Sequence, residues 1–135
     1  MKERCVKPGK IDISELNVPP EQAEFETAKY FAALGKDINF IQPSSIPNQH
    51  RPDIRMDGVE WEIKSPQGDS KRTIENNMRK AIKQSHNIIF DLRHMRTQDD
   101  RCVSQLIQQF NKRSQLRRLL IIKRNGELLS YLKKN

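Results

Sequence analysis

The dipeptide Asp57-Gly58 is the feature that most limits how this chain can fold. It separates two short runs in which apolar and charged residues alternate, and this arrangement is typical of a two-residue β-hairpin turn. Such a turn gives each residue of the two strands a defined partner, and it predicts that Asp53 lies opposite Glu62. The hairpin therefore decides which side chains share a face of the sheet.

Strand alternation divides the predicted hairpin into an apolar and a charged face, because successive side chains point to opposite sides. The apolar face carries Ile54, Met56, Val59, Trp61 and Ile63. The charged face carries Asp53, Arg55, Glu60, Glu62 and Lys64. The first set is expected to lie in the core, and the second is available for chemistry.

The charged face brings two carboxylates together. Asp53 and Glu62 are predicted to form a non-hydrogen-bonded pair, with Cα atoms about 4.5 Å apart. Like charges at this distance are destabilising unless a cation or a shared proton relieves the repulsion, and a divalent metal ion is the simplest relief. Lys64 lies one pleat further on the same face, where its ammonium group can orient a water molecule or stabilise charge developing on a phosphate.

Hydrophobic spacing predicts the elements around this hairpin. They are a helix over 21–34, a strand over 37–42, a helix over 73–85, a strand over 87–92, a helix capped by Asp99 or Asp100, and two strands over 116–123 and 127–131 that flank the turn Asn125-Gly126. The fold class is α/β in the sense of an α+β mixed sheet packed by helices. Residues 1–20 are expected to form a leader or linker, and residues 21–135 a single domain.

Charge is unevenly distributed along the chain, whose net charge is +8 at pH 7. Residues 1–70 contain 9 basic and 12 acidic side chains, whereas residues 71–135 contain 16 basic and 5 acidic ones. A basic half attracts polyanions, because phosphate contacts supply most non-specific affinity for nucleic acid, although a solubilising basic surface explains the charge equally well. No apolar run approaches the roughly 18 residues that cross a bilayer, which excludes a membrane-spanning protein. The two cysteines imply neither a disulfide framework nor a structural zinc site.

Two short segments resemble the signature of the PD-(D/E)XK nucleases. These are Pro52-Asp53 and, beginning nine residues after Asp53, Glu62-Ile63-Lys64. The predicted order of helix, three strands, helix and strand matches the core of that superfamily, with a further helix and a C-terminal β-hairpin after it. More narrowly, residues 51–54, 57–66 and 84–92 look like the C-terminal tRNase toxin domains of contact-dependent growth inhibition (CdiA) proteins. The resemblance covers residues 21–132.

This resemblance implies a metal-dependent endoribonuclease that cleaves tRNA. Asp53 and Glu62 would hold a divalent ion, for which Mg²⁺, Mn²⁺ and Zn²⁺ are all candidates. Lys64 would position the attacking water or stabilise the transition state. Glu24, whose spacing to later alanine and glycine residues matches those enzymes, would add a ligand directly or through water.

Other residues are expected to support the site or to bind substrate. Gln84, on the predicted helix over 73–85, would reach toward the carboxylates, although it equally suits a backbone contact at a helix end. Ser65 and Ser70, in the loop after the catalytic strand, would contact phosphate. A basic flank for substrate phosphates would comprise Arg113, Arg117 and Arg118, for which an ordinary solvated surface is the alternative.

The resemblance also implies a setting for the protein. A cognate immunity protein would block the site, and the basic chain predicts an acidic face on that inhibitor. The domain would be the C-terminal part of a longer secreted or cell-surface protein that acts in the cytoplasm of a target cell, without inserting into a membrane itself. A cytoplasmic nuclease that stands alone is the alternative. Two other functions share the same evidence: a DNA endonuclease of the superfamily, and a non-catalytic module that binds nucleic acid.

Overall fold

The structure is a computed structural model that describes residues 7–68, 71–96 and 99–133. Within these ranges the strands form one mixed sheet in the order β1-β2-β3-β4-β5-β6-β7. The strands are β1 Ile11–Asp12, β2 Ile38–Phe40, β3 Ile54–Met56, β4 Val59–Lys64, β5 Asn87–Asp91, β6 Arg118–Ile122 and β7 Leu128–Leu132. The helices are α1 Gln22–Ala33, α2 Lys71–Ala81 and α3 Asp99–Lys112. The predicted order is confirmed, and the sheet is mixed as expected.

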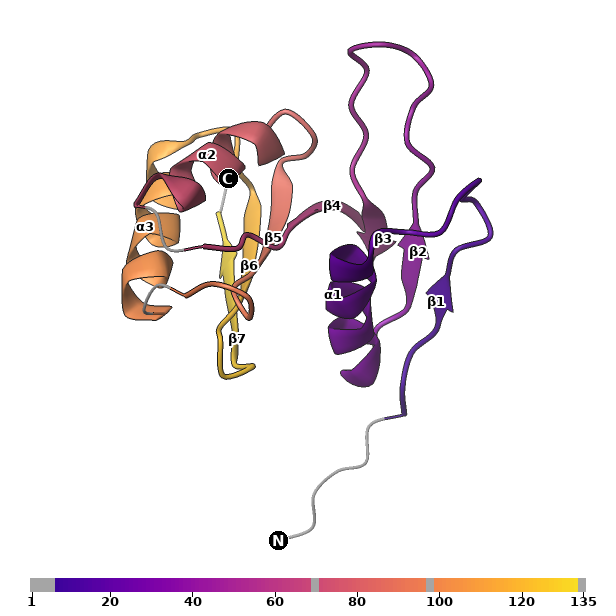
Figure 1. Ribbon diagram of the computed structural model, residues 1–135, viewed down its shortest axis with the longest axis horizontal. Helices are drawn as coiled ribbons and strands as arrows, with labels where there is room; N and C mark the ends of the chain where they lie inside the picture. The colour runs from indigo at the N-terminus through magenta and orange to yellow at the C-terminus, as the bar shows by residue number, and fades with distance from the viewer. Residues whose placement is uncertain (1–6, 69–70, 97–98, 134–135) are drawn as a thin grey trace, which may run out of the picture.

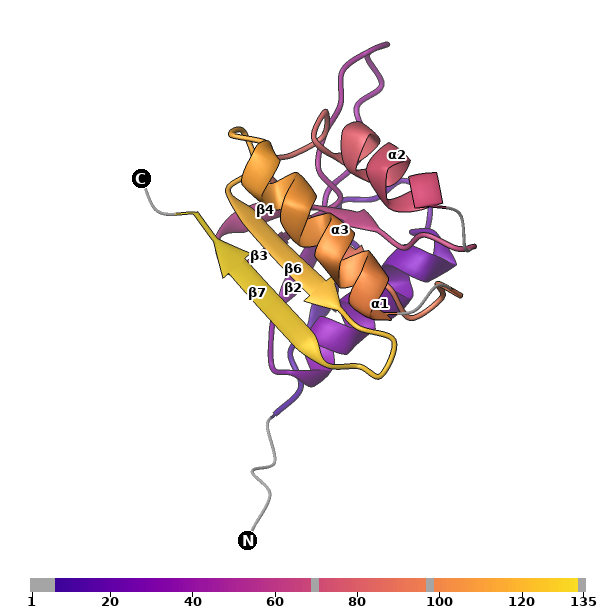
Figure 2. The ribbon, with the colours of Figure 1, turned by 90° about the vertical axis from the view of Figure 1, so that its left-hand side faces the viewer.

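Helices cover both faces of the sheet, so the chain has two apolar cores. Figures 1 and 2 show α2 and α3 together on one side of β5 and β6 and α1 on the other side. Alternate residues of β5 enter different cores: Ile88 and Phe90 pack with α2 and α3, whereas Ile89 packs with α1. The parallel strands β4, β5 and β6 are therefore buried on both faces, which explains the continuous apolar run in β5. None of the helices in the described ranges combines the length and apolar character that a membrane crossing requires.

The hairpin forms in the predicted register from the turn as far as Ile54 and Trp61, and the last predicted pair does not form. Ile54 pairs with Trp61, and both residues of the Asp57-Gly58 turn have positive φ, 55° and 73°, as the favoured hairpin turn requires. The paired ladder ends at Ile54, because the N–H of Asp53 also donates to the carbonyl oxygen of Trp61, at 2.9 Å. The predicted backbone pairing of Asp53 with Glu62 is therefore wrong.

The sequence signals for α1 are confirmed at both ends. Pro20 precedes the helix, and Gly35 follows it with φ of 92°. The N–H of Gly35 donates to Ala32 and the N–H of Lys36 to Phe31, which is the Schellman pattern that glycine favours after a helix. The C-terminal turn behaves similarly, since Gly126 has φ of 91° between β6 and β7.

Two segments differ from expectation. Helix α2 ends at Ala81, so Gln84 lies in the turn after the helix and not on it. The chain leaves the helix early because the Ser85 hydroxyl donates to the carbonyl oxygen of Glu60 on β4, at 2.9 Å. Residues 11–12, inside the expected leader, form the parallel edge strand β1. Strand β1 is too short to show a hydrophobic period, so it left no pattern in the sequence.

Candidate active site

The charged face of the hairpin gathers three predicted catalytic groups. One carboxylate oxygen of Asp53 accepts a hydrogen bond from the N–H of Ile63, at 2.8 Å, which holds this carboxylate against β4. The carboxyl group of Glu62 is buried, since the residue is only 4% exposed. The ammonium nitrogen of Lys64 lies 3.4 Å from Oε2 of Glu62. Side-chain contact between Asp53 and Glu62 thus survives the loss of their backbone pairing.

Burial and repulsion raise the pKa of both carboxyl groups. For Glu62 burial is the largest cause and the negative charge of Asp53 the next, while the Lys64 ammonium opposes them only in part. For Asp53 burial again dominates, and the hydrogen bond from Ile63 counteracts it incompletely. Such a pair favours a shared proton or a bound cation, because two buried negative charges in contact are costly.

Helix α1 adds a third carboxylate to this region. Glu24 lies in the first turn of α1, and burial, followed by the charges of Asp53 and Glu21, raises its pKa to about 7. Glu24, Glu21 and Asp53 line one cavity of about 220 Å³. The rest of its lining comes from the segment before α1 and from β2 and the residues after it, namely Leu16, Val18, Pro19, Pro20, Phe40, Ile41 and Pro43. The structure therefore brings Glu24 to the predicted site. It also adds Glu21, which the sequence analysis missed although it lies one helical turn before Glu24.

The donor groups fit a hard divalent ion held by two carboxylates. In the described parts of the chain, no three Asp, Glu, His or Cys side chains are grouped so as to hold a metal ion. Glu24, the predicted third ligand, is therefore not grouped with the other two carboxylates for direct binding. The pair of Asp53 and Glu62 remains, and Oε1 of Glu62 is buried without a hydrogen-bond partner. Mg²⁺ is commonly bound through one or two carboxylates, with water and substrate phosphates as its other ligands. An unpaired buried oxygen beside a second carboxylate suits this mode of binding.

The predicted supporting residues have different environments. The buried hydroxyl oxygen of Ser65 has no hydrogen-bond partner among the described residues. Gln84 lines a cavity of about 210 Å³ together with Asp53, so it approaches the site from the turn after α2. Ser70 lies outside the described residues.

The three predicted substrate-binding arginines do not act alike. The side chain of Arg113 donates to Gln109 on α3, at 2.8 Å. Arg117 contributes its backbone N–H to His86, at 2.8 Å. Arg118 donates to Oδ1 of Asn87, at 3.2 Å, and lines a hollow of about 580 Å³ beside the hairpin. Of the three, Arg118 is the one that the structure places beside this hollow.

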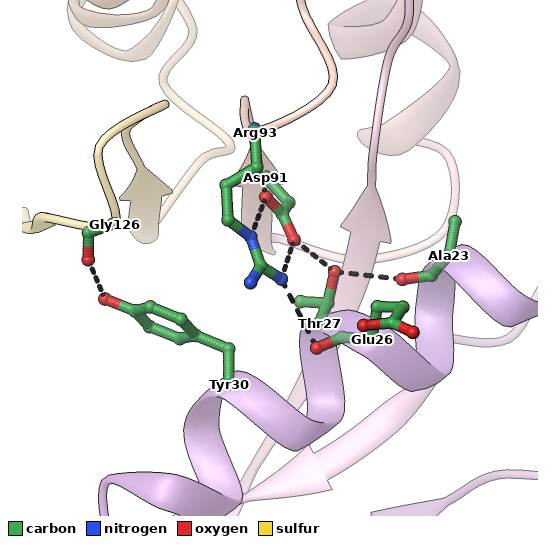
Figure 3. Close-up of polar contacts among 7 residues, drawn as sticks. All are labelled: Ala23, Glu26, Thr27, Tyr30, Asp91, Arg93 and Gly126. Atoms are coloured by element: carbon green, nitrogen blue, oxygen red, sulfur yellow. Dashed lines mark hydrogen bonds and ion pairs between the residues drawn. The ribbon is translucent and has the colours of Figure 1, made fainter.

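A second buried polar cluster, the Asp91 cluster, attaches α1 to the end of β5 (Figure 3). Arg93 donates to both carboxylate oxygens of Asp91, at 2.9 and 2.7 Å, and Thr27 of α1 donates to Oδ2, at 2.7 Å. Burial alone would raise the pKa of Asp91, but the hydrogen bonds from Arg93 and Thr27 outweigh it, so this pKa is lowered. Arg93 also reaches the carbonyl oxygen of Glu26, at 3.3 Å.

The Asp91 cluster affects the candidate site because it holds α1, the helix that carries Glu24. Thr27 follows Glu24 by about one helical turn, so contacts that hold Thr27 also position Glu24. Tyr30 donates to the carbonyl oxygen of Gly126, at 2.6 Å, and adds a further attachment for α1 (Figure 3). This cluster was not predicted from the sequence. Its signal was an acidic residue at the end of the apolar run of β5, with Arg93 two residues later.

Two comparisons with known proteins agree. The family model of the contact-dependent growth inhibition CdiA C-terminal domain matches residues 50–128, more than half of the chain. This segment includes Asp53, Glu62 and Lys64, whereas Glu24 lies before it. No curated protein sequence matches. Among solved structures, the chain is similar to one in the "CdiA-CT/CdiI toxin and immunity complex from Burkholderia pseudomallei", with a TM-score of 0.66 and 16% identity over 93% of this chain and 100% of that chain. At this identity the likeness concerns the fold.

Proposed function

The chain belongs to the contact-dependent growth inhibition CdiA C-terminal domain family, and from this membership we propose that it is a metal-dependent endoribonuclease that cleaves tRNA. The observation that carries the proposal is the buried contact of Asp53 with Glu62, whose pKa values are both raised, beside the ammonium group of Lys64. Perturbed carboxyl groups that converge in a cavity are characteristic of catalytic sites. The order of elements and the Asp, Glu and Lys positions support membership of the PD-(D/E)XK nucleases.

Each group has a role in this reaction. Asp53 and Glu62 would hold Mg²⁺, Mn²⁺ or Zn²⁺, and the ion would polarise the phosphate and acidify a water molecule. Lys64 would stabilise the negative charge that develops on the phosphate oxygens, because its ammonium group is fixed beside Glu62. Glu24, with a pKa of about 7, is suited to accept a proton from the attacking water near neutral pH.

The first test compares substrates and ions. Purified protein is incubated with total tRNA and, in parallel, with plasmid DNA, in EDTA and in each of Mg²⁺, Mn²⁺ and Zn²⁺. We expect cleavage of tRNA that requires an added ion, with the plasmid left intact. Cleavage of the plasmid alone would support a DNA endonuclease, and retention of nucleic acid without cleavage in any ion would support a binding module. The fragments of tRNA and of plasmid DNA are separated by size on a denaturing gel.

The raised carboxyl pKa values also predict how stability depends on pH in metal-free protein. Glu24 has an ordinary pKa of 4.5 and a folded-state pKa of about 7. Between these values the folded state binds more protons than the unfolded state, so the free energy of unfolding falls as pH rises from about 4.5 to 7. Urea unfolding in EDTA at several pH values measures this slope.

A matched pair of variants assigns that slope to its residue. Glu24→Gln should make the decrease between pH 4.5 and 7 shallower without abolishing it, because one of the groups that gain a proton on folding is gone while Asp53 and Glu62 remain. Glu26→Gln, the same change two residues later on α1, should leave most of it. An unchanged slope in Glu24→Gln would show that the carboxyl of Glu24 is not held in the cavity as described.

The family membership sets the biological role that we propose. The domain is delivered by a longer secreted or cell-surface CdiA protein and acts in the cytoplasm of the target cell. A cognate immunity protein protects the producing cell by covering the site, and the net charge of +8 favours an inhibitor with an acidic face. The similar solved chain comes from a toxin and immunity complex, which supports such a partner.

A further inference from the structure

A groove of about 580 Å³, here called the hairpin groove, lies beside the candidate site. Its floor is the start of β4 at Glu60, and its wall is the turn over 82–87 that joins α2 to β5. The wall is tied to the floor, because Ser85 and Asn87 both donate side-chain hydrogen bonds to the carbonyl oxygen of Glu60, at 2.9 and 3.3 Å. The groove is therefore a fixed feature of the surface.

The hairpin groove is continuous with the candidate site. Glu60 on its floor and Glu62 point to the same face of β4, two residues or about 7 Å apart along the strand. Pro52 and Gln84 line the groove and also line the cavity that contains Asp53. A ligand that lies in the groove thus passes Gln84 and reaches the carboxylate pair.

Cationic groups border this groove on the side of the turn and of β6. The cations Lys83 and Arg118 are among its lining residues, and so is the imidazole of His86. In the described part of the chain, no hydrogen bond or ion pair engages the side chain of Lys83 or His86, and Arg118 uses one donor on Asn87. The acidic lining residue Glu60 is partly neutralised by Arg55, whose Nε lies 3.3 Å from its carboxylate.

We infer that the hairpin groove binds the phosphodiester backbone of a nucleic-acid strand on one side of the cleaved bond. This inference rests on the proposed function, because it assigns the path of the substrate of that same site. Lys83 and Arg118 contact phosphates, and Gln84 lies between them and the carboxylates. An open, polar groove with unpaired cations suits a strand that continues beyond the site, since backbone phosphates position a nucleic acid on a protein without reading its bases.

The test measures binding separately from cleavage. The full chain with Glu62→Gln is titrated with fluorescently labelled tRNA, by anisotropy, over a series of KCl concentrations in EDTA. The pair Lys83→Gln and Arg118→Gln, added to this background, should weaken binding and reduce the slope of log K against log[salt] by about 1 per lost phosphate contact. The control pair is Arg101→Gln and Lys112→Gln on α3, which removes the same charge away from the groove.

The outcomes separate this inference from the proposed function. If both pairs change affinity and slope equally, only the net charge matters and the groove assignment is overturned. If the groove pair alone weakens binding, the groove is a binding site for nucleic acid, whether or not the wild-type protein cleaves tRNA. An absence of tRNA cleavage would contradict the nuclease proposal and would leave this binding result in place. In active protein the groove pair should raise KM and leave kcat nearly unchanged. If the double variant does not fold, the same titration is made with Lys83→Gln alone, because Lys83 is exposed.

Discussion

Replacing Glu62 with Gln is expected to lower tRNA cleavage by on the order of 10³-fold, because it removes a carboxylate that would hold the divalent ion at the reacting phosphate. Gln preserves the size and hydrogen-bonding capacity of this buried side chain, so the change isolates its charge. Initial cleavage rates on a denaturing gel at fixed Mg²⁺ measure the effect. Cleavage at the wild-type rate would contradict the assignment of Glu62.

Stability distinguishes this catalytic role from a structural one. Repulsion between Asp53 and Glu62 contributes to the raised pKa of Glu62, and Glu62→Gln removes it. The free energy of unfolding in EDTA should therefore be equal to or higher than that of the wild type, as is usual where a site is arranged for function and not for stability. Glu127→Gln, the same change at an exposed position before β7, should retain cleavage and serves as the matched control.

Asp91→Ala is expected to lower the free energy of unfolding by about 3–5 kcal/mol, because it leaves one partner of a largely buried ion pair uncompensated. Asp91 is 1% exposed, and its removal deprives Arg93 of three hydrogen bonds, two from the guanidinium group and one from the backbone N–H, and Thr27 of one. Urea unfolding at pH 7 measures the change. A loss below about 1 kcal/mol, the range of surface ion pairs, would show that the Asp91 cluster does not hold α1 to the sheet.

Two further variants test whether the unpaired charge of Arg93 causes this loss of stability. Glu127→Ala removes the acidic partner of an exposed pair with Lys123, 3.2 Å long, and should cost less than about 1 kcal/mol. Replacing Asp91 and Arg93 together with Leu and Met should be less destabilising than Asp91→Ala, since no charge is then left unpaired in the protein interior. A double replacement that destabilises as much as Asp91→Ala would indicate that packing, and not the unpaired arginine, accounts for the loss.

Local patterns predicted the elements well where neighbouring residues decide the structure. The Asp57-Gly58 turn needs two residues of positive φ, and the pairing of Ile54 with Trp61 follows from it by counting. Gly35 ended α1 where expected, because glycine alone adopts its conformation without strain. Hydrophobic spacing failed at the end of α2, where a side-chain hydrogen bond from Ser85 to β4 overrides the local preference for helix.

The sequence by itself determined the hairpin, the order of the elements and which charged residues share a face, because these depend on turn chemistry and on the two-residue and 3.6-residue periods of the backbone. Tertiary structure decided which distant groups meet. Thr27 and Asp91 are 64 residues apart, and Glu24 reaches the cavity of Asp53 only when α1 packs against the sheet. The raised pKa of Glu24 and the hairpin groove also follow from that packing, because burial and the charges of distant residues create both.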